Sequence, residues 1–229
     1  MKTLVIAPHP DDELLGCGGT ILRRASDGYT VGLIHMTSIS EETGWTSDQI
    51  GKRASEIKAV CDGLGVKNIH YFPLGFHSTE LDQLPLVDLV RGISKVVTEF
   101  QPTELLIPNE SDAHSDHRVT FKAATACSKW FRCPSIKRIM AYETLSETDA
   151  SLGQEKIFAP TIFVDISLQM EKKLALMRLY QSEIDDFPFP RSEEAIRALG
   201  MVRGAQVGFS AAEAFMLLRE RETLGTALS

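Results

Sequence analysis

Cysteine is scarce in this chain, and the few present have no spacing that points to metal or redox chemistry. The 229 residues contain four cysteines, and no two of them have the C-x-x-C spacing of a zinc knuckle or a thiol redox motif. All four fall in segments whose pattern indicates a helix or a helix end. The arrangement favours reduced, partly buried thiols over a disulfide or zinc-cysteine framework.

Long hydrophobic runs and a basic excess are also missing. The apolar stretches are only strand-sized, far short of the roughly 20 residues that cross a bilayer, and the N-terminal run lacks a signal-peptide pattern. Lys and Arg number 24 against 31 Asp and Glu, a net charge of -7, which argues against binding nucleic acid or an anionic membrane surface. We therefore expect a cytoplasmic protein with no membrane span, and the sequence is compatible with a homo-oligomer.

The composition and length are those of one globular domain. Hydrophobic residues make up 43% and charged residues 24%, and no repeat, low-complexity segment or linker divides the chain. A length of 229 residues suffices for one α/β domain and is short for two, so we expect a single domain over 1–229.

Short β-branched runs alternate with amphipathic helical stretches through the first two-thirds of the chain. This alternation predicts an α/β fold: a Rossmann-like three-layer αβα arrangement with a mostly parallel sheet. In such sheets, ligands bind beyond the carboxyl ends of the strands, near the point where the strand order reverses. The predicted strands are Thr3–Ala7, Tyr29–Thr37, His70–Pro73, Glu104–Ile107, Ile136–Tyr142 and a last one from Thr161; the predicted helices are Leu14–Asp27, 48–64, 84–100, 117–131, Leu168–Tyr180 and 192–201.

Four polar groups follow the first predicted strand within five residues. In the run Pro8-His9-Pro10-Asp11-Asp12-Glu13, His9 and Asp12 offer an imidazole and a carboxylate, both standard zinc ligands, from a turn stiffened by two prolines. Asp11 lies between them and is left free to act as a general base beside a metal.

A second polar loop follows the strand that ends at Ile107. It contains His114 and His117, three residues apart and flanked by Asp112 and Asp116. One of the two histidines can complete a His-Asp-His site with an open fourth position, the pattern of catalytic zinc, and the other can face the substrate. Each loop alone is weak evidence, but together they place three ligands and two acid-base groups at one edge of the sheet.

These two loops resemble those of the LmbE-like, or PIG-L, family of zinc-dependent N-acetylglucosaminyl de-N-acetylases. The residues that carry the resemblance are the run from Ala7 to Glu13 and the run from Asp112 to Arg118, with supporting matches along nearly the whole chain. Ser115 departs from the family pattern, which usually has proline there.

The resemblance implies a role for each residue of the two loops. His9, Asp12 and His117 would bind one Zn²⁺ per chain, Asp11 would be the general base, and His114 would act on the substrate carbonyl or on the leaving amine. From the groups present we expect His114 to be cationic and to stabilise the developing oxyanion together with the metal. Asp116 would orient His114, and Arg53 would contact the substrate. Fe²⁺ fits the same ligands, because they do not select sharply among first-row metals.

The implied activity is hydrolysis of the N-acetyl group of an N-acetylated amino sugar or its conjugate, a small-molecule substrate. The same chemistry also suits an amidase that acts on a non-sugar amide conjugate, and a non-enzymatic ligand-binding protein is the third alternative. The sequence leaves the roles of Trp45, His77 and Glu13 open, together with the identity of the group that protonates the leaving amine.

Overall fold

A seven-stranded sheet forms the centre of the protein, and its strands lie in the order β3-β2-β1-β4-β5-β7-β6. The computed structural model describes residues 1–65, 69–152 and 157–222. The strands are β1 (Lys2–Ala7), β2 (Thr30–Ser38), β3 (Ile69–His77), β4 (Glu104–Pro108), β5 (Arg138–Tyr142), β6 (Ile162–Asp165) and β7 (Ala212–Glu220). The helices are α1 (Asp12–Ser26), α2 (Ser47–Gly65), α3 (Leu86–Phe100), α4 (Ser115–Ala126), α5 (Met170–Met177) and α6 (Glu193–Ala205), with short 3-10 turns at Glu41–Thr43 and Leu81–Gln83.

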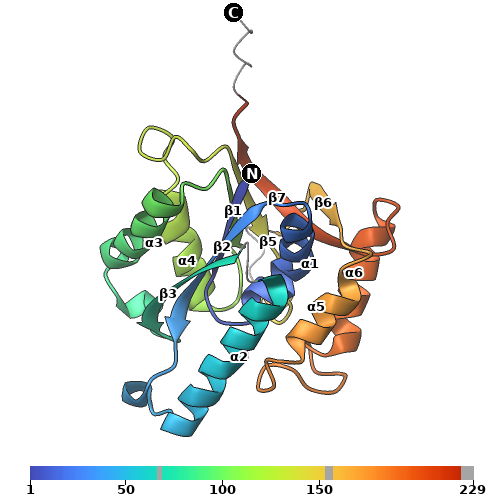
Figure 1. Ribbon diagram of the computed structural model, residues 1–229, viewed down its shortest axis with the longest axis horizontal. Helices are drawn as coiled ribbons and strands as arrows, with labels where there is room; N and C mark the ends of the chain where they lie inside the picture. Colours follow the sequence, from blue (N-terminus) through green and yellow to red (C-terminus); the bar gives the residue numbers. More distant parts are fainter. Residues whose placement is uncertain (66–68, 153–156, 223–229) are drawn as a thin grey trace, which may run out of the picture.

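The helices form one layer on each side of the sheet (Figure 1). Helices α3 and α4 cover one face, and α1, α2, α5 and α6 cover the other. The five strands β1 to β5 run parallel, as the strand-helix alternation predicts. The predicted three-layer αβα fold with a mostly parallel sheet is confirmed.

The sequence-based prediction missed the last strand. Strand β7 lies antiparallel between β5 and β6, so the C-terminal part of the chain enters the sheet instead of extending it at an edge. Only its first half is buried, and the exposed second half lacks the alternation that indicates a strand.

The strand order reverses at β1, which has β2 on one side and β4 on the other. This is the topological switch point of the sheet, and the loops that follow β1 and β4 lie there. These are the two loops that carry the histidines and aspartates.

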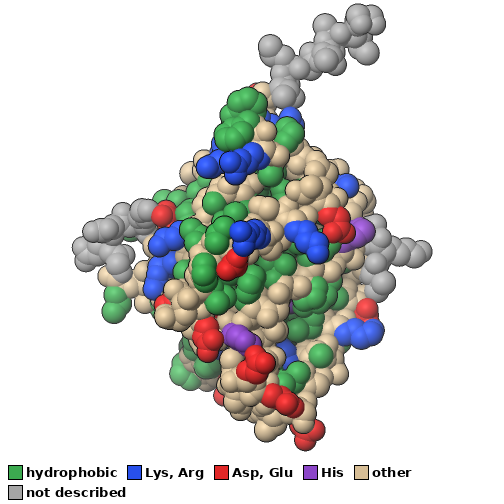
Figure 2. All heavy atoms as spheres, turned by 90° about the vertical axis from the view of Figure 1, so that its left-hand side faces the viewer, with side chains coloured by type: hydrophobic (Ala, Val, Ile, Leu, Met, Phe, Trp, Pro, Cys, Tyr) green, Lys and Arg blue, Asp and Glu red, His purple; other side chains and the backbone are tan. Residues whose placement is uncertain are grey.

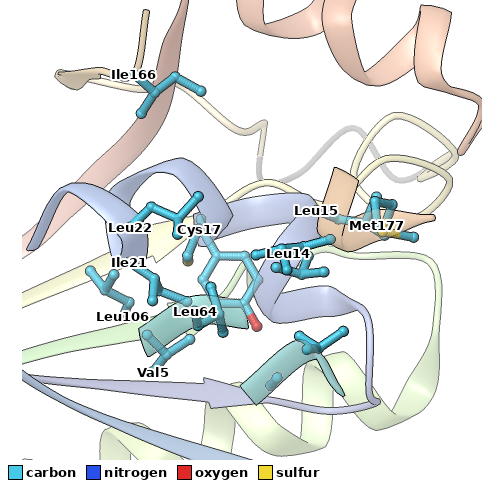
Figure 3. Packing of buried hydrophobic residues seen from close by; sticks show 14 of the residues in the cluster. Val5, Leu14, Leu15, Cys17, Ile21, Leu22, Leu64, Leu106, Ile166 and Met177 are labelled. Carbon is cyan, nitrogen blue, oxygen red and sulfur yellow. The ribbon is translucent and has the colours of Figure 1, made fainter. Parts of the chain in front are cut away.

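Helix α1 packs unusually closely on the sheet, and its glycines allow the approach. A Cβ at Gly16 would lie 2.3 Å from Cδ2 of Tyr142, and a Cβ at Gly19 would lie 2.6 Å from Ile166. Figure 3 shows the apolar side chains that fill the space around this helix, among them Leu14 and Cys17. The close packing fixes the start of α1, where Asp12 is the first residue.

Among the described residues, no helix is both long enough and apolar enough to cross a membrane. On the face that carries α3 and α4, acidic and basic side chains are interspersed with hydrophobic ones (Figure 2).

Candidate metal centre and active site

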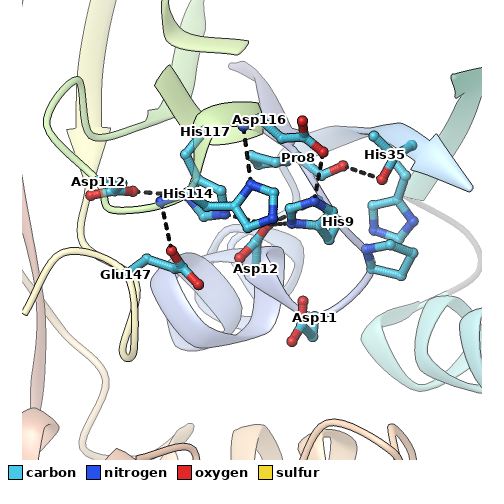
Figure 4. A network of polar contacts seen from close by, with 12 residues as sticks. Pro8, His9, Asp11, Asp12, His35, Asp112, His114, Asp116, His117 and Glu147 are labelled. Carbon is cyan, nitrogen blue, oxygen red and sulfur yellow. Dashed lines mark hydrogen bonds and ion pairs between the residues drawn. The ribbon is translucent and has the colours of Figure 1, made fainter. Parts of the chain in front are cut away.

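Three side chains from the two loops converge on a small volume at the switch point. One ligand atom from each of His9, Asp12 and His117 lies within 4.8 Å of the other two. Asp12 Oδ2 is 3.3 Å from His9 Nδ1 and 3.2 Å from His117 Nε2. Figure 4 shows the Asp12 carboxylate beside the two rings. The three groups can hold a cation between them, and a two-histidine, one-carboxylate set is a zinc-type ligand set.

His117 has the clearest signature of a metal ligand. Its Nδ1 is hydrogen-bonded to Asp112 Oδ2 at 2.8 Å, while its Nε2 is buried and has no hydrogen-bond partner among the described residues. The Asp112 carboxylate in turn accepts the Thr148 hydroxyl at 2.7 Å. A carboxylate on the far nitrogen of an imidazole holds the tautomer whose other nitrogen can bind a metal. The residues present therefore fit a metal ion held by His9, Asp12 and His117.

The raised pKa values of His9 and His117 also indicate a site that attracts positive charge. Burial by itself lowers the pKa of His9, but hydrogen bonds to Asp116 and Asp12 override it and raise the pKa to about 9. Burial also opposes the charge of His117, and the carboxylates of Asp12 and Asp112 raise its pKa well above the usual value. The pocket of carboxylates thus attracts positive charge, which a metal ion supplies in place of protons.

The carboxylate of Asp116 lies against His9, not against His114 as the sequence-based interpretation expects. Its Oδ2 accepts a hydrogen bond from His9 Nε2 at 3.0 Å. Its two oxygens also accept hydrogen bonds from the backbone N–H groups of Thr79 and Leu81. The hydrogen bond between Asp116 and His114 comes from the Asp116 backbone N–H, which donates to His114 Nδ1 at 3.0 Å, while a carboxylate oxygen of Asp116 lies within 4.8 Å of a His114 ring nitrogen. The Asp116 carboxylate therefore orients the imidazole of His9.

Replacement of Asp116 by asparagine should accordingly weaken metal binding by about 10- to 100-fold, the usual effect of losing an outer carboxylate–imidazole contact. Metal affinity measured by competition with a chromogenic chelator tests this. Asp82→Asn, at an exposed position of the turn Leu81–Gln83, is the matched control and should bind metal like the parent. Equal affinities in Asp116→Asn and Asp82→Asn would show that the Asp116 carboxylate does not support the site.

Asp11 lies outside the ligand set, with its carboxylate to one side of the cluster in Figure 4. It has an unusual backbone conformation, φ 139°, which a non-glycine residue adopts only when its surroundings hold it there. Glu13 provides that support, because its carboxylate accepts the Asp11 backbone N–H at 3.0 Å and is itself held by His35 and by the Tyr180 hydroxyl. Burial, together with the negative charge of Asp12, raises the pKa of Asp11 well above its usual value.

A pocket of about 200 Å³ opens over this cluster. Trp45 and Arg53 line it, as do three residues that the sequence did not single out: Glu147, Glu183 and Arg191. His77 is not among the lining residues; it contacts Ser40 and Glu42 instead. The three additional residues come from the loops after β5 and after α5, and no local sequence motif marks them.

The fold and this cluster together define an α/β protein with a possible metal site at the switch point of its sheet. Residues 4–128 match the model of the PIG-L family, described as GlcNAc-PI de-N-acetylase. The chain belongs to this family, whose deacetylases are metal-dependent hydrolases of amide bonds.

Two relatives extend the likeness beyond the family model. The chain is 30% identical to the diacetylchitobiose deacetylase of Thermococcus kodakarensis over 93% of this chain and 81% of that protein. It is 25% identical to the N,N'-diacetylchitobiose deacetylase from Pyrococcus horikoshii, with a TM-score of 0.74 over 95% of this chain and 84% of that one.

A third relative shares the fold alone. The hydratase GalB from Pseudomonas putida KT2440 has a TM-score of 0.75 at 19% identity and covers 99% of this chain and 100% of its own. Because this fold also supports a hydration reaction, the reaction of the present protein has to be argued from its site.

Proposed function

We propose that this protein is a zinc-dependent hydrolase that removes the N-acetyl group from an N-acetylated amino sugar or its conjugate. The observation that carries the proposal is the buried Nε2 of His117, which makes no hydrogen bond to a described residue and faces Asp12 at 3.2 Å. Beside it lies a carboxylate, Asp11, that is outside the ligand set. The kinship with deacetylases of N-acetylated sugars supports the choice of an acetamide as the group attacked.

In this proposal one zinc ion per chain binds to His9, Asp12 and His117, and Fe²⁺ can take the same ligands. When bound, the ion would polarise the acetyl carbonyl and lower the pKa of water to about 7. Three protein ligands leave the fourth position open, as in catalytic zinc sites.

Asp11 is the general base. It takes a proton from the attacking water while the water oxygen forms a bond to the acetyl carbon. Its raised pKa suits this task, because a base acts best when its pKa lies close to the pH at which it works. Glu13 holds the backbone that presents it.

His114 donates a hydrogen bond from Nε2 to the developing oxyanion. Its Nδ1 accepts the backbone N–H of Asp116, so in this conformation the ring carries its proton on Nε2 and is neutral. Burial and the nearby charge of His9 lower the pKa of His114, which favours the same neutral form. The cationic His114 expected from the sequence does not fit this hydrogen bond.

Because the His114 ring is neutral, the source of the proton that the leaving amine takes up can also be identified. A neutral imidazole that gave up its only N–H proton would become an anion, so the departing amine takes the proton that Asp11 received. The carbon–nitrogen bond breaks, acetate remains, and Asp11 is again a carboxylate. One residue therefore acts first as base and then as acid.

The substrate side of the pocket includes Arg53, which we assign to substrate contact. Its guanidinium donates to the Ser182 hydroxyl at 2.8 Å and to Glu183, and it forms an ion pair with Glu56 at 3.7 Å within helix α2. A volume of 200 Å³ is below the range of about 300–1,000 Å³ found for larger ligands. It suits a substrate that inserts a single acetamido sugar ring, with any conjugated group outside.

The purified protein should release acetate from methyl N-acetylglucosaminide, and removal of the metal by dipicolinate should lower the rate by roughly 100-fold or more, because Lewis-acid catalysis contributes several kcal/mol. Added Zn²⁺ should restore the rate. A panel that includes N-acetylated amino acids and simple acetamides discriminates between the two enzyme classes. Faster turnover of the non-sugar amides would favour the amidase, and full activity in metal-free protein would contradict the proposal.

A further inference from the structure

Arg191 is a pocket residue with unused hydrogen-bonding capacity. It precedes helix α6, lines the pocket over the metal centre, and its side chain is 23% exposed. Its Nε is buried and has no hydrogen-bond partner among the described residues. A guanidinium has five N–H donors in a rigid fork, and a buried donor without a partner is costly. Because Nε is buried, the donors of Arg191 that a ligand in the pocket can reach are those of Nη1 and Nη2, on the exposed part of the side chain.

The two carboxylates nearest to Arg191 do not satisfy those donors. Asp11 Oδ2 is 3.7 Å from Nη1, and Glu183 Oε2 is 3.4 Å from Nη2, both beyond the ordinary N–H···O limit of about 3.2 Å. The Phe189 ring, 5.3 Å from the guanidinium carbon, supports it from another side. The group is thus held in place by charge and by an aromatic contact, without hydrogen bonds that a ligand would have to break.

Arg53 provides the contrast within the same pocket. Its guanidinium already donates to Glu183 and to Ser182, the latter at 2.8 Å. Glu183 therefore lies between the two arginines, with one oxygen bound to Arg53 and the other turned toward Arg191. A ligand oxygen finds free donors at Arg191.

The charges around Arg191 indicate what kind of ligand oxygen it receives. Asp11 and Glu183 place two carboxylates beside Arg191, and Glu183 also binds Arg53, so the carboxylates offset the positive charge that would attract an incoming anion. A neutral hydroxyl needs no net positive charge. The hydroxyl oxygen can accept a hydrogen bond from the guanidinium, and its O–H can donate one to the adjacent carboxylate.

We propose that Arg191, paired with Glu183, forms a subsite for the hydroxyl groups of a neutral pyranose ring and so selects sugars over other N-acetyl compounds. This inference rests on the proposed function and specifies how the same site recognises its substrate class. A site built to bind a hydroxyl discriminates strongly against an analogue that lacks it, because its polar groups are then left buried and unpaired.

The sequence provides a reporter for this subsite. The chain has two tryptophans, and Trp45 lines the pocket, whereas Trp130 lies in the connection from α4 to β5. In a Trp130→Phe background, Trp45 fluorescence reports on ligands that enter the pocket of the metal-loaded protein. The titration needs no turnover, so it is read independently of deacetylase activity.

Three amines are titrated: methyl glucosaminide, cyclohexylamine, which has the ring and the amine without hydroxyls, and glucosamine 6-phosphate, which adds an anion. Arg191→Met should weaken methyl glucosaminide binding by about 10- to 100-fold, the loss expected for hydrogen bonds to a charged group. Its effect on cyclohexylamine should be under about 3-fold. Arg191→Lys, which keeps the charge without the fork, should recover only part of the affinity.

Arg197→Met is the matched control, because Arg197 is on the exposed side of α6 in an ion pair with Glu171. It should bind all three amines like the parent. Equal losses for methyl glucosaminide and cyclohexylamine in Arg191→Met would overturn the proposal, as would no fluorescence response of the parent to methyl glucosaminide. Tight binding of glucosamine 6-phosphate that depends on Arg191 would make the residue an anion receptor and would also overturn it. A parent protein without deacetylase activity would instead contradict the proposed function, while the titration still tests Arg191.

Discussion

The Asp11→Asn enzyme is expected to keep its metal and to lose about 100-fold or more in kcat. Asparagine has nearly the shape of aspartate but cannot accept the proton of the attacking water or return it to the amine. Asp11 is outside the set of converging ligand atoms, so the substitution leaves His9, Asp12 and His117 in place. Acetate release under saturating substrate, together with metal content by elemental analysis, measures both parts of the expectation.

Asp12→Asn is the matched comparison, because it makes the same chemical change one residue further along the chain. Asp12 is close to both imidazoles, so its neutral form should bind the metal more weakly and should recover part of its activity when zinc is added. The opposite pattern, with metal lost in Asp11→Asn and kept in Asp12→Asn, would reverse the assignment of the two carboxylates.

His117→Ala should remove both the metal and the activity. The imidazole supplies the buried Nε2 of the ligand set, and alanine leaves His9 and Asp12 as a two-ligand site open to water. A site with three protein ligands is the minimum seen in catalytic zinc enzymes, so the metal-to-protein ratio should fall from one to near zero after dialysis. Elemental analysis and calorimetric titration with Zn²⁺ give the ratio directly.

His70→Ala is the control for this experiment. His70 is exposed on the edge strand β3, where its ring contacts Phe100 far from the pocket residues. It should keep the metal and the activity of the parent. Retention of stoichiometric metal by His117→Ala would show that the ion is held elsewhere.

The parallel part of the fold could be predicted because each of its elements is encoded locally. A buried parallel strand is a short apolar run, and an amphipathic helix has its own period, so β1 to β5 and their helices are visible in the sequence. The strand ends differ from the predictions by a few residues; β3, for example, extends from Ile69 to His77 where only His70–Pro73 was expected. Strand β7 was missed because its exposed half depends on pairing with β5, a contact between residues distant in the chain.

The sequence also predicted that the two polar loops lie close together. Parallel strands that end in polar residues bring those residues to one edge of the sheet, and β1 and β4 are neighbours at the switch point. The sequence could not decide which of His114 and His117 belongs with His9 and Asp12; only the resemblance to the family favoured His117. The structure brings His117 to Asp12 and leaves His114 bonded to the backbone N–H of Asp116.

The sequence by itself determined the fold class and the chemical groups at the site, since both depend on residue type and on short-range order along the chain. The tertiary structure alone decided which of those groups touch. It placed the Asp116 carboxylate against His9. It included Asp12 in the set of converging ligand atoms and left Asp11 out of it. It also brought Arg191, from a loop distant in the chain, to within 3.7 Å of Asp11 in the pocket wall. The reason is physical: side-chain direction and burial arise from packing among segments remote in the chain, and hydrogen-bond partners are chosen over a few ångströms of space.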